Sequence, residues 1–178
     1  MLGFLQRDRH ARVGRALYAE AVAAARAPYF YTGIGVADTV DGRFDLVGLH
    51  AFLLIRRLQR EPEGAALAQA VFDAMFADMD ASLREMGVGD LSIPARVRAL
   101  REAFHGRAAA YERGFADPDP AALAAALARN VWRGAPRAGG ADRLAGIARA
   151  QDAHLAAQPL AAFAAGTAAF LPPAEASA

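Results

Sequence analysis

The chain has 178 residues, a net charge of +1 and no cysteine. This length is typical of one domain, and such a domain buries about 70% of its unfolded surface, so it needs no disulfide or metal to fold. The missing cysteine fits the cytoplasm, and the near-neutral charge argues against a general affinity for nucleic acid. All 20 basic residues are arginines, which we attribute to a GC-rich genome.

The amino-terminal 15 residues are rich in arginine but lack the apolar core of a secretory signal, so we expect mature protein there. Apolar residues at helical spacing predict a first helix over about residues 9–27, which Pro28 ends. The next 15 residues, 29–43, hold three aromatic residues and three glycines. We expect a long loop with a turn at Asp41–Gly42, and loops of this length are often functional.

Residues 44–58 form the most apolar stretch and leave almost no polar face at helical periodicity, which indicates a buried helix. The stretch is shorter than the roughly 20 residues of a membrane span, and arginines interrupt it. We therefore predict the central helix of a bundle, at about residues 45–60. Asp45 is its expected amino-terminal cap, and Phe44 and Leu49 are placed to form a hydrophobic staple.

Helices also fill the rest of the chain. Pro62 suits the first turn of a third helix that reaches about Met86. Ser92 and Asp119 are predicted to cap the fourth and fifth helices, and a last one runs from about residue 141 until Pro159 kinks or divides it. We see no strand pattern, so the sequence predicts an all-α, single-domain bundle of about six helices over residues 1–178.

Charges are unevenly distributed over the third and fourth helices. Residues 61–90 hold seven acids and one arginine, whereas residues 91–115 hold five arginines and two acids. Helices of opposite charge would attract each other if they pack side by side. Asp80 and Arg84 are expected to pair within one helix. Asp78 lies at the edge of the apolar arc, and we expect it to be buried and paired with an arginine of the fourth helix.

The carboxy-terminal residues 153–174 carry no formal charge, yet they include four large apolar residues, Leu160, Phe163, Phe170 and Leu171. Such a segment can lie on a membrane surface or dock on the bundle. We favour docking.

Most catalytic signatures are missing from the sequence. We find no glycine-rich phosphate loop, no paired histidines at ligand spacing and no nucleophile elbow. His50, in the central helix, and His105, after Phe104, are more typical of structural histidines than of metal ligands. We predict no catalytic, cofactor or metal site.

Four segments stand out in combination: TVDGRFDLVGLHAFLLIRRL (39–58), FDAMFADMDASLREMGVGDLSIPARV (72–97), AFHGRAAAYE (103–112) and LARNVW (127–132). Their order resembles the ubiquinol–cytochrome c chaperone family, the bacterial relatives of the mitochondrial factor that assembles cytochrome b into respiratory complex III. The resemblance covers about residues 10–135 and is looser over residues 141–178. This chain departs from the family at His105, where a tyrosine is usual, and at Ala95-Arg96, where the family often has Lys-Arg.

The resemblance implies a non-enzymatic assembly chaperone that holds newly synthesised cytochrome b, in the cytoplasm at the inner face of the inner membrane. It implies transient contact with the membrane surface, and a small partner protein or the ribosome as further partners, without nucleic acid or cofactor. The matching motifs contain the charged residues that we take as candidate partner-binding residues, Arg43, Asp45, Arg56, Arg57, Asp73, Asp78, Asp80, Arg84, Glu85, Arg96 and Arg107. Met75, Met79 and Met86 are either an adaptable apolar surface or ordinary core, which we favour.

A chaperone of this kind predicts an exposed apolar or charged groove. The alternative is a small all-α enzyme or binding protein for a lipophilic quinone or isoprenoid, which predicts an enclosed apolar cavity where Asp78, His50 or His105 converge. A third hypothesis is a peripheral membrane module that uses the carboxy-terminal segment.

Overall fold

The computed structural model describes the backbone of residues 2–176 and the side chains of residues 7–176. Over residues 2–176 the chain is all-α, as predicted, with six long helices and three of four or five residues. The long helices are α1 (Leu2–Ala25), α3 (Val40–Leu58), α4 (Ala65–Glu85), α5 (Ile93–Ala116), α6 (Ala121–Val131) and α7 (Gly140–Ala156). The short helices are α2 (Tyr29–Thr32), α8 (Leu160–Ala164) and α9 (Pro173–Ala176), and a 3₁₀ turn, Pro62–Gly64, precedes α4.

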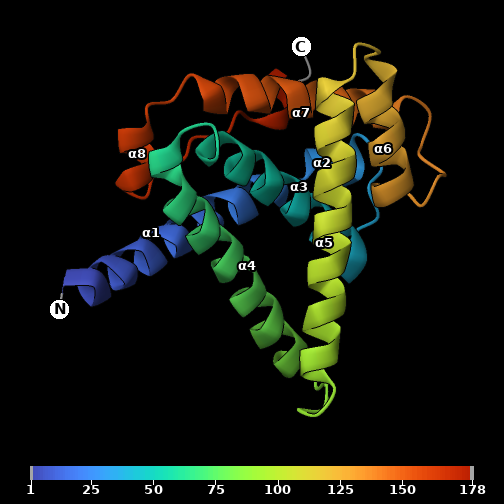
Figure 1. Cartoon of the computed structure of the whole chain (residues 1–178). Helices are drawn as coiled ribbons and strands as arrows, with labels where there is room; N and C mark the ends of the chain where they lie inside the picture. Colours follow the sequence, from blue (N-terminus) through green and yellow to red (C-terminus); the bar gives the residue numbers. More distant parts are fainter. Residues whose placement is uncertain (1, 177–178) are drawn as a thin grey trace.

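Helix α3 is the centre of the bundle, and 13 of its 19 residues are buried. It contacts α1, α4, α5, α6 and α7, so the prediction of a buried central helix is confirmed. Helix α7 crosses one end of the bundle, whereas α4 and α5 converge on a connection that projects from the opposite end (Figure 1). This arrangement leaves the far ends of α4 and α5 with few neighbours.

Helix α1 packs along α4 and begins at Leu2, earlier than the predicted residue 9. The arginine-rich start contains no proline, so the helix extends through it. Gly14 permits the close approach of the two helices, because a Cβ atom at this position would lie 2.6 Å from the backbone of Ala70.

Helix α3 begins at Val40, before the predicted start. Thr39 is the actual cap: its backbone is extended, and its Oγ1 accepts a hydrogen bond from the Gly42 backbone N at 3.2 Å. The expected turn at Asp41–Gly42 is therefore the first turn of the helix. Asp45, the predicted cap, lies inside the helix and is buried, so that prediction was wrong.

The contact between α4 and α5 does not use opposite charges. No ion pair joins these two helices among the side chains of residues 7–176. Instead the Arg101 guanidinium lies 5.3 Å from the ring centre of Phe72 and 4.7 Å from that of Phe76. The predicted attraction between the acidic and basic helices is thus replaced by cation–π contacts.

Two of the predicted helix starts differ in their capping. Asp119 Oδ1 accepts a hydrogen bond from the Ala121 backbone N at 2.9 Å, as predicted for α6. Ser92 precedes α5 without a capping hydrogen bond, because its hydroxyl donates to the carbonyl of Gly89 at 2.8 Å. Ser92 therefore stabilises the preceding turn and leaves the amino-terminal end of α5 without a side-chain cap.

The carboxy-terminal segment docks on the bundle, as favoured from the sequence. Phe163 is buried, and Leu160, Phe170 and Leu171 pack against the core. The Gln151 side chain exchanges hydrogen bonds with the backbone of Leu171 at 2.7 and 2.9 Å. Pro159 separates α7 from α8. In the described part of the chain, no helix has the length and apolar character that a membrane crossing needs.

Candidate functional site

Four helices surround an open groove of about 700 Å³. Its walls are α1, the start of α3, the end of α4 and the start of α5. The apolar part of the lining consists of Val22, Val40, Phe44, Val47, Met79, Leu83, Met86, Ala99 and Leu100, and the charged part of Arg26, Asp41, Arg43, Asp78, Glu85 and Arg96. The groove therefore combines apolar and charged side chains, as a binding surface for an amphipathic partner would.

Two of the three exposed large apolar residues lie on this groove. Across residues 7–176 the three are Val40, Met86 and Leu91. Val40 and Met86 line the groove, and Leu91 belongs to the connection between α4 and α5 that projects from the bundle (Figure 1). Single exposed apolar residues are ordinary, but a cluster of them indicates an interaction site.

Asp78 faces α1, contrary to the prediction that it would be buried against α5. It is exposed, and its Oδ2 accepts a hydrogen bond from the Tyr18 hydroxyl at 2.8 Å. Burial of the Tyr18 ring, and the nearby carboxylate, raise the pKa of Tyr18 well above its usual value. The tyrosine thus stays protonated and serves as a donor that fixes the Asp78 carboxylate on the groove wall.

The other candidates on the groove have exposed side chains. Arg43 Nε lies 2.7 Å from Asp38 Oδ1, and this pairing lowers the pKa of Asp38. Glu85 belongs to the α4 wall and Arg96 to the α5 wall, and both are exposed. These residues are therefore available to a partner.

Met75 and Met79 of α4 and Met86, which follows its last residue, do not form one stripe. Met75 is buried and belongs to the core, as favoured, whereas Met79 is half-buried and Met86 is exposed, and both line the groove. The groove therefore has two flexible apolar side chains that can adapt to different partners.

The predicted pair of Asp80 and Arg84 is present and extends into the connection. Arg84 Nε lies 2.7 Å from Asp80 Oδ1, and its Nη1 lies 2.7 Å from Asp90 Oδ1. One arginine thus joins the last turn of α4 to the following loop.

Asp45 and Arg107 meet inside the bundle and are not on its surface. Asp45 is buried, with one carboxylate oxygen 2.9 Å from Arg107 Nη2 and the other 2.8 Å from Arg133 Nη1. Burial raises the pKa of Asp45, although the two guanidinium groups oppose this shift. The Arg107 guanidinium also lies 5.4 Å from the ring centre of Phe44, which lines the groove. This cluster supports the groove from inside.

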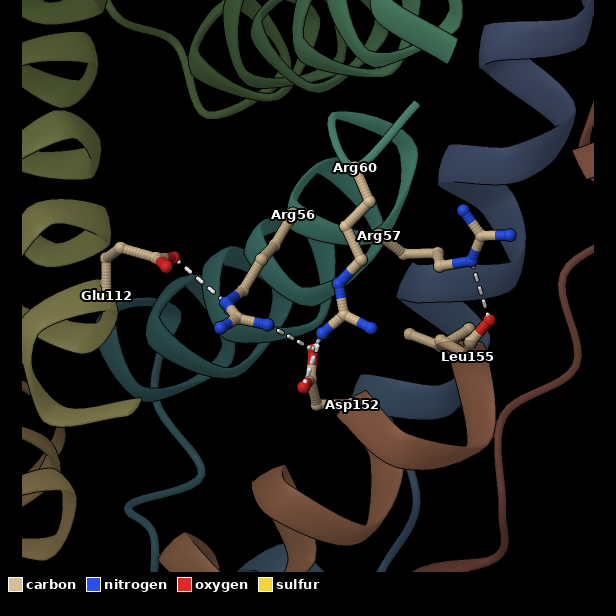
Figure 2. A network of polar contacts seen from close by, with 6 residues as sticks. All are labelled: Arg56, Arg57, Arg60, Glu112, Asp152 and Leu155. Atoms are coloured by element: carbon tan, nitrogen blue, oxygen red, sulfur yellow. Dashed lines mark hydrogen bonds and ion pairs between the residues drawn. The ribbon is translucent and has the colours of Figure 1, made fainter. Parts of the chain in front are cut away.

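Arg56 and Arg57 fasten the carboxy-terminal helices to α3 (Figure 2). Arg56 bonds Glu112 of α5 at 2.9 Å and Asp152 of α7 at 2.8 Å. Arg57 is buried, and its guanidinium donates to the backbone carbonyls of Leu155 and Gln158 at 3.0 and 2.8 Å. It therefore caps the carboxyl end of α7. Both arginines have structural roles.

Asp73 lies outside the groove. It is exposed beside the α1–α4 contact and accepts a hydrogen bond from the Gln69 amide at 2.9 Å. Conversely, the sequence-based reasoning missed Tyr18, Arg26 and Leu91 as residues of the site. Leu91 carried a usable signal, because an apolar residue in a short Gly-containing connection between two helices has little to pack against.

The side chains required by the quinone-site alternative do not converge. His50 is buried between Phe30 and Phe170, its Nδ1–H donates to the Leu46 carbonyl at 2.8 Å, and burial lowers its pKa to about 4. His105 lies on a different groove of about 520 Å³, formed by α3, α4 and α5. Within residues 7–176 there is also no group of three His, Cys, Asp or Glu side chains arranged to hold a metal.

Comparisons with known proteins agree with the resemblance found in the sequence. Residues 32–170 match the model of the family described as ubiquinol–cytochrome c chaperone. The match thus reaches further into the carboxy-terminal segment than residue 135. The chain is 25% identical over 103 residues to ubiquinol–cytochrome-c reductase complex assembly factor 1 of Xenopus laevis, which covers 57% of this chain and 51% of that protein. It therefore spans about half the length of the Xenopus relative.

The fold is also found in a solved structure. The crystal structure of the Cbp3 homolog from Brucella abortus superimposes with a TM-score of 0.84, at 35% sequence identity, over 98% of this chain and 99% of that one. The family match covers most of the chain, and the bundle is shared over nearly its whole length. The chain therefore belongs to the ubiquinol–cytochrome c chaperone family.

Proposed function

We propose that this protein is an assembly chaperone of ubiquinol–cytochrome c reductase that binds newly synthesised cytochrome b in the groove between α1, α3, α4 and α5, without catalysis. The observation that carries the proposal is the exposure of two large apolar side chains on the groove, Val40 and Met86, with a third, Leu91, in the connection that follows Met86. Exposed apolar side chains that line a groove with charged residues are typical of an interaction site. The family membership and the name of the Xenopus relative support the same function.

The chemistry of the groove suits a membrane-protein client. A newly made transmembrane helix exposes apolar side chains, and such a helix can place one face in an apolar groove. The flexible side chains of Met79 and Met86 adapt to helices of different sequence, and the surrounding charges suit the polar loops of the client. Covering the apolar face would delay aggregation until the client's partner subunits are added.

The alternative, an enzyme or binding protein for a lipophilic quinone or isoprenoid, is less well supported. Its three expected residues, His50, His105 and Asp78, lie in the core and on two separate grooves. Both grooves are open rather than enclosed, whereas a small-ligand site usually buries most of its ligand. We therefore favour macromolecular binding.

We further infer that the protein works in the cytoplasm at the inner face of the inner membrane, where the client is inserted. Residues 1–15 carry four arginines and one aspartate, a net charge of +3, whereas the rest of the chain carries 16 arginines and 18 acids, a net charge of −2. An anionic leaflet attracts a basic segment of this kind, by about 1 kcal/mol per arginine near the surface. This supports transient membrane contact through α1.

Site-specific photocrosslinking tests the proposed client. A photoreactive residue at Met86 is expected to form an adduct with newly synthesised cytochrome b, whereas one at Ala125, exposed on α6, serves as the control. Loss of the gene should selectively reduce the b-type haem signal of complex III in difference spectra of membranes. Equal adduct yields at Met86 and Ala125, or an unchanged haem spectrum, would contradict the proposed function.

A further inference from the structure

We propose that the acidic, apolar connection between α4 and α5, here called the tip (residues 85–92), recognises the basic flank at the cytoplasmic end of an apolar client helix. The inference rests on the proposed function and specifies which part of the client is bound. It draws on three observations: the ordered backbone of the tip, the exposure of Leu91, and the distribution of charge around the groove.

The tip is held in one conformation although it projects from the bundle. The backbone N of Val88 donates to the Leu83 carbonyl at 3.0 Å, and the backbone N of Gly87 donates to the Arg84 carbonyl at 2.9 Å. Gly87 has a φ of 78°, which closes the helix end. The Arg84 bridge to Asp80 and Asp90 fastens the loop from the side. A partner therefore meets a preorganised surface, which lowers the entropic cost of binding.

Leu91 is the apolar element that this turn presents. Its side chain is as exposed as in an extended peptide, so nothing in the described bundle covers it. Transfer of one leucine side chain from water into an apolar contact strengthens binding by about tenfold to a hundredfold. Met86 lies at the other end of the same connection and leads into the groove. Together the two residues extend the apolar lining outward.

Charge is unevenly distributed between the walls of the groove. The charged side chains of the α4 wall, Asp78 and Glu85, are both acidic, whereas the other three walls contribute three arginines, Arg26, Arg43 and Arg96, and one acid, Asp41. Residues 78–90 carry four acids and one arginine, and that arginine is already bonded to two of the acids. Among the side chains of residues 7–176, Asp78 is bonded only by a neutral tyrosine hydroxyl. The α4 wall and the tip therefore keep a negative charge.

This charge selects among the possible partners. An anionic lipid surface would be repelled by the tip, whereas a basic peptide would be attracted. Membrane proteins carry an excess of Lys and Arg on the cytoplasmic side of their apolar helices. The junction between an apolar helix and its basic flank thus matches both the exposed Leu91 and the acids beside it. The basic flank would lie toward the tip, with the apolar turns in the groove.

Three fluorescent peptides test the inference. They share one amphipathic Leu/Ala helix and end in three arginines, three glutamates or three glutamines. Fluorescence anisotropy should give at least about tenfold tighter binding of the Arg peptide than of the Glu peptide. The Glu85→Gln/Asp90→Asn variant should reduce this ratio to about twofold. The control Glu20→Gln/Glu102→Gln, which removes the same charge at exposed positions outside the groove, should leave the ratio unchanged.

The apolar contact is tested by Leu91→Ser, which should weaken all three peptides by about tenfold, whereas Leu91→Met should retain the affinity. Both substitutions are at an exposed position, so the fold tolerates them. Equal binding of the Arg and Glu peptides, or wild-type affinity of Leu91→Ser, would overturn the inference. Leu91-dependent flotation with phosphatidylglycerol vesicles would overturn it too. Crosslinking from Met86 to cytochrome b is independent of the peptide measurements. A positive crosslink therefore supports the proposed function even if the peptides show no preference for a basic flank.

Discussion

Arg57→Met removes a buried guanidinium while it keeps an apolar side chain of similar reach. In the folded protein this group donates to the Leu155 and Gln158 carbonyls, contacts Glu61 at 2.6 Å and lies 5.2 Å from the ring centre of Phe163. Methionine can fill the space beside Phe163 but cannot donate a hydrogen bond. The carbonyls at the end of α7 would therefore lose their donors.

The magnitude of the effect follows from these contacts. Each carbonyl left without its donor costs about 1–3 kcal/mol, and the lost cation–π contact adds about 1 kcal/mol. The Glu61 pair adds little, because the Glu61 side chain is partly exposed to water. Release of a buried charge partly offsets these losses. We expect a net decrease of about 3–4 kcal/mol in the free energy of unfolding, a large part of the 5–15 kcal/mol typical of domains.

Urea denaturation measures this loss, and Arg60→Met is the matched control. Arg60 lies three residues further along and pairs with Asp152 at 2.7 Å, but it is exposed, so its loss should cost less than about 1 kcal/mol. Hydrogen exchange should show faster opening of α7 and α8 in Arg57→Met, ahead of α4. Equal stability of the two variants, to within about 0.5 kcal/mol, would refute the assignment of Arg57 as the cap of α7.

Three further predictions concern the core. Asp45→Ala leaves Arg107 without its buried partner and should lower the free energy of unfolding by about 3–5 kcal/mol. In urea titrations, the Asp45→Ala/Arg107→Met double variant should lose less stability than the sum of the losses in the two single variants. Burial lowers the pKa of His50 to about 4 from an ordinary value of 6.5. Between these two pH values the unfolded chain binds more protons than the folded one, so the free energy of unfolding should fall by up to about 3 kcal/mol as the pH drops from 6.5 to 4. His50→Leu should flatten this part of the curve of stability against pH. Gly14→Val would overlap the backbone of α4 and should cost about 2 kcal/mol or more, whereas Gly146→Ala, which has open space around it, should raise the melting temperature slightly.

The sequence predicts those parts of the fold that depend on neighbours along the chain. Residues 44–58 are apolar on all sides, and this alone indicated the buried α3. Pro159 marked the division between α7 and α8, and four large apolar residues in an uncharged segment, Leu160, Phe163, Phe170 and Leu171, were compatible with the docking that we favoured. The start of α3 was misplaced because Asp41–Gly42 has the composition of a turn, while Thr39 supplies the cap.

The candidate site was less predictable, because its charges find partners far along the chain. Asp45 looks like a cap locally, but its partners are 62 and 88 residues away. Arg56 and Arg57 were candidate partner-binding residues, yet they bond residues of α5 and α7. Of the 11 candidate residues, the structure places Arg43, Asp78, Glu85 and Arg96 on the groove. All 11 candidates belong to the same family motifs, so the motifs could not distinguish the four groove residues from candidates with structural roles, such as Asp45 and Arg57.

The position of Arg57 in the chain has a consequence for synthesis. Its carbonyl acceptors lie 98 and 101 residues later, so at about 5–20 residues per second the ribosome makes them roughly 5–20 s after the arginine. During that interval the carboxyl end of α3 has no α7 or α8 to cover it, and this helix, most of which is buried in the folded protein, stays accessible to other chains. The nascent chain is thus prone to aggregation until its own last helices emerge, and its yield should depend on the general chaperones that meet it at the ribosome.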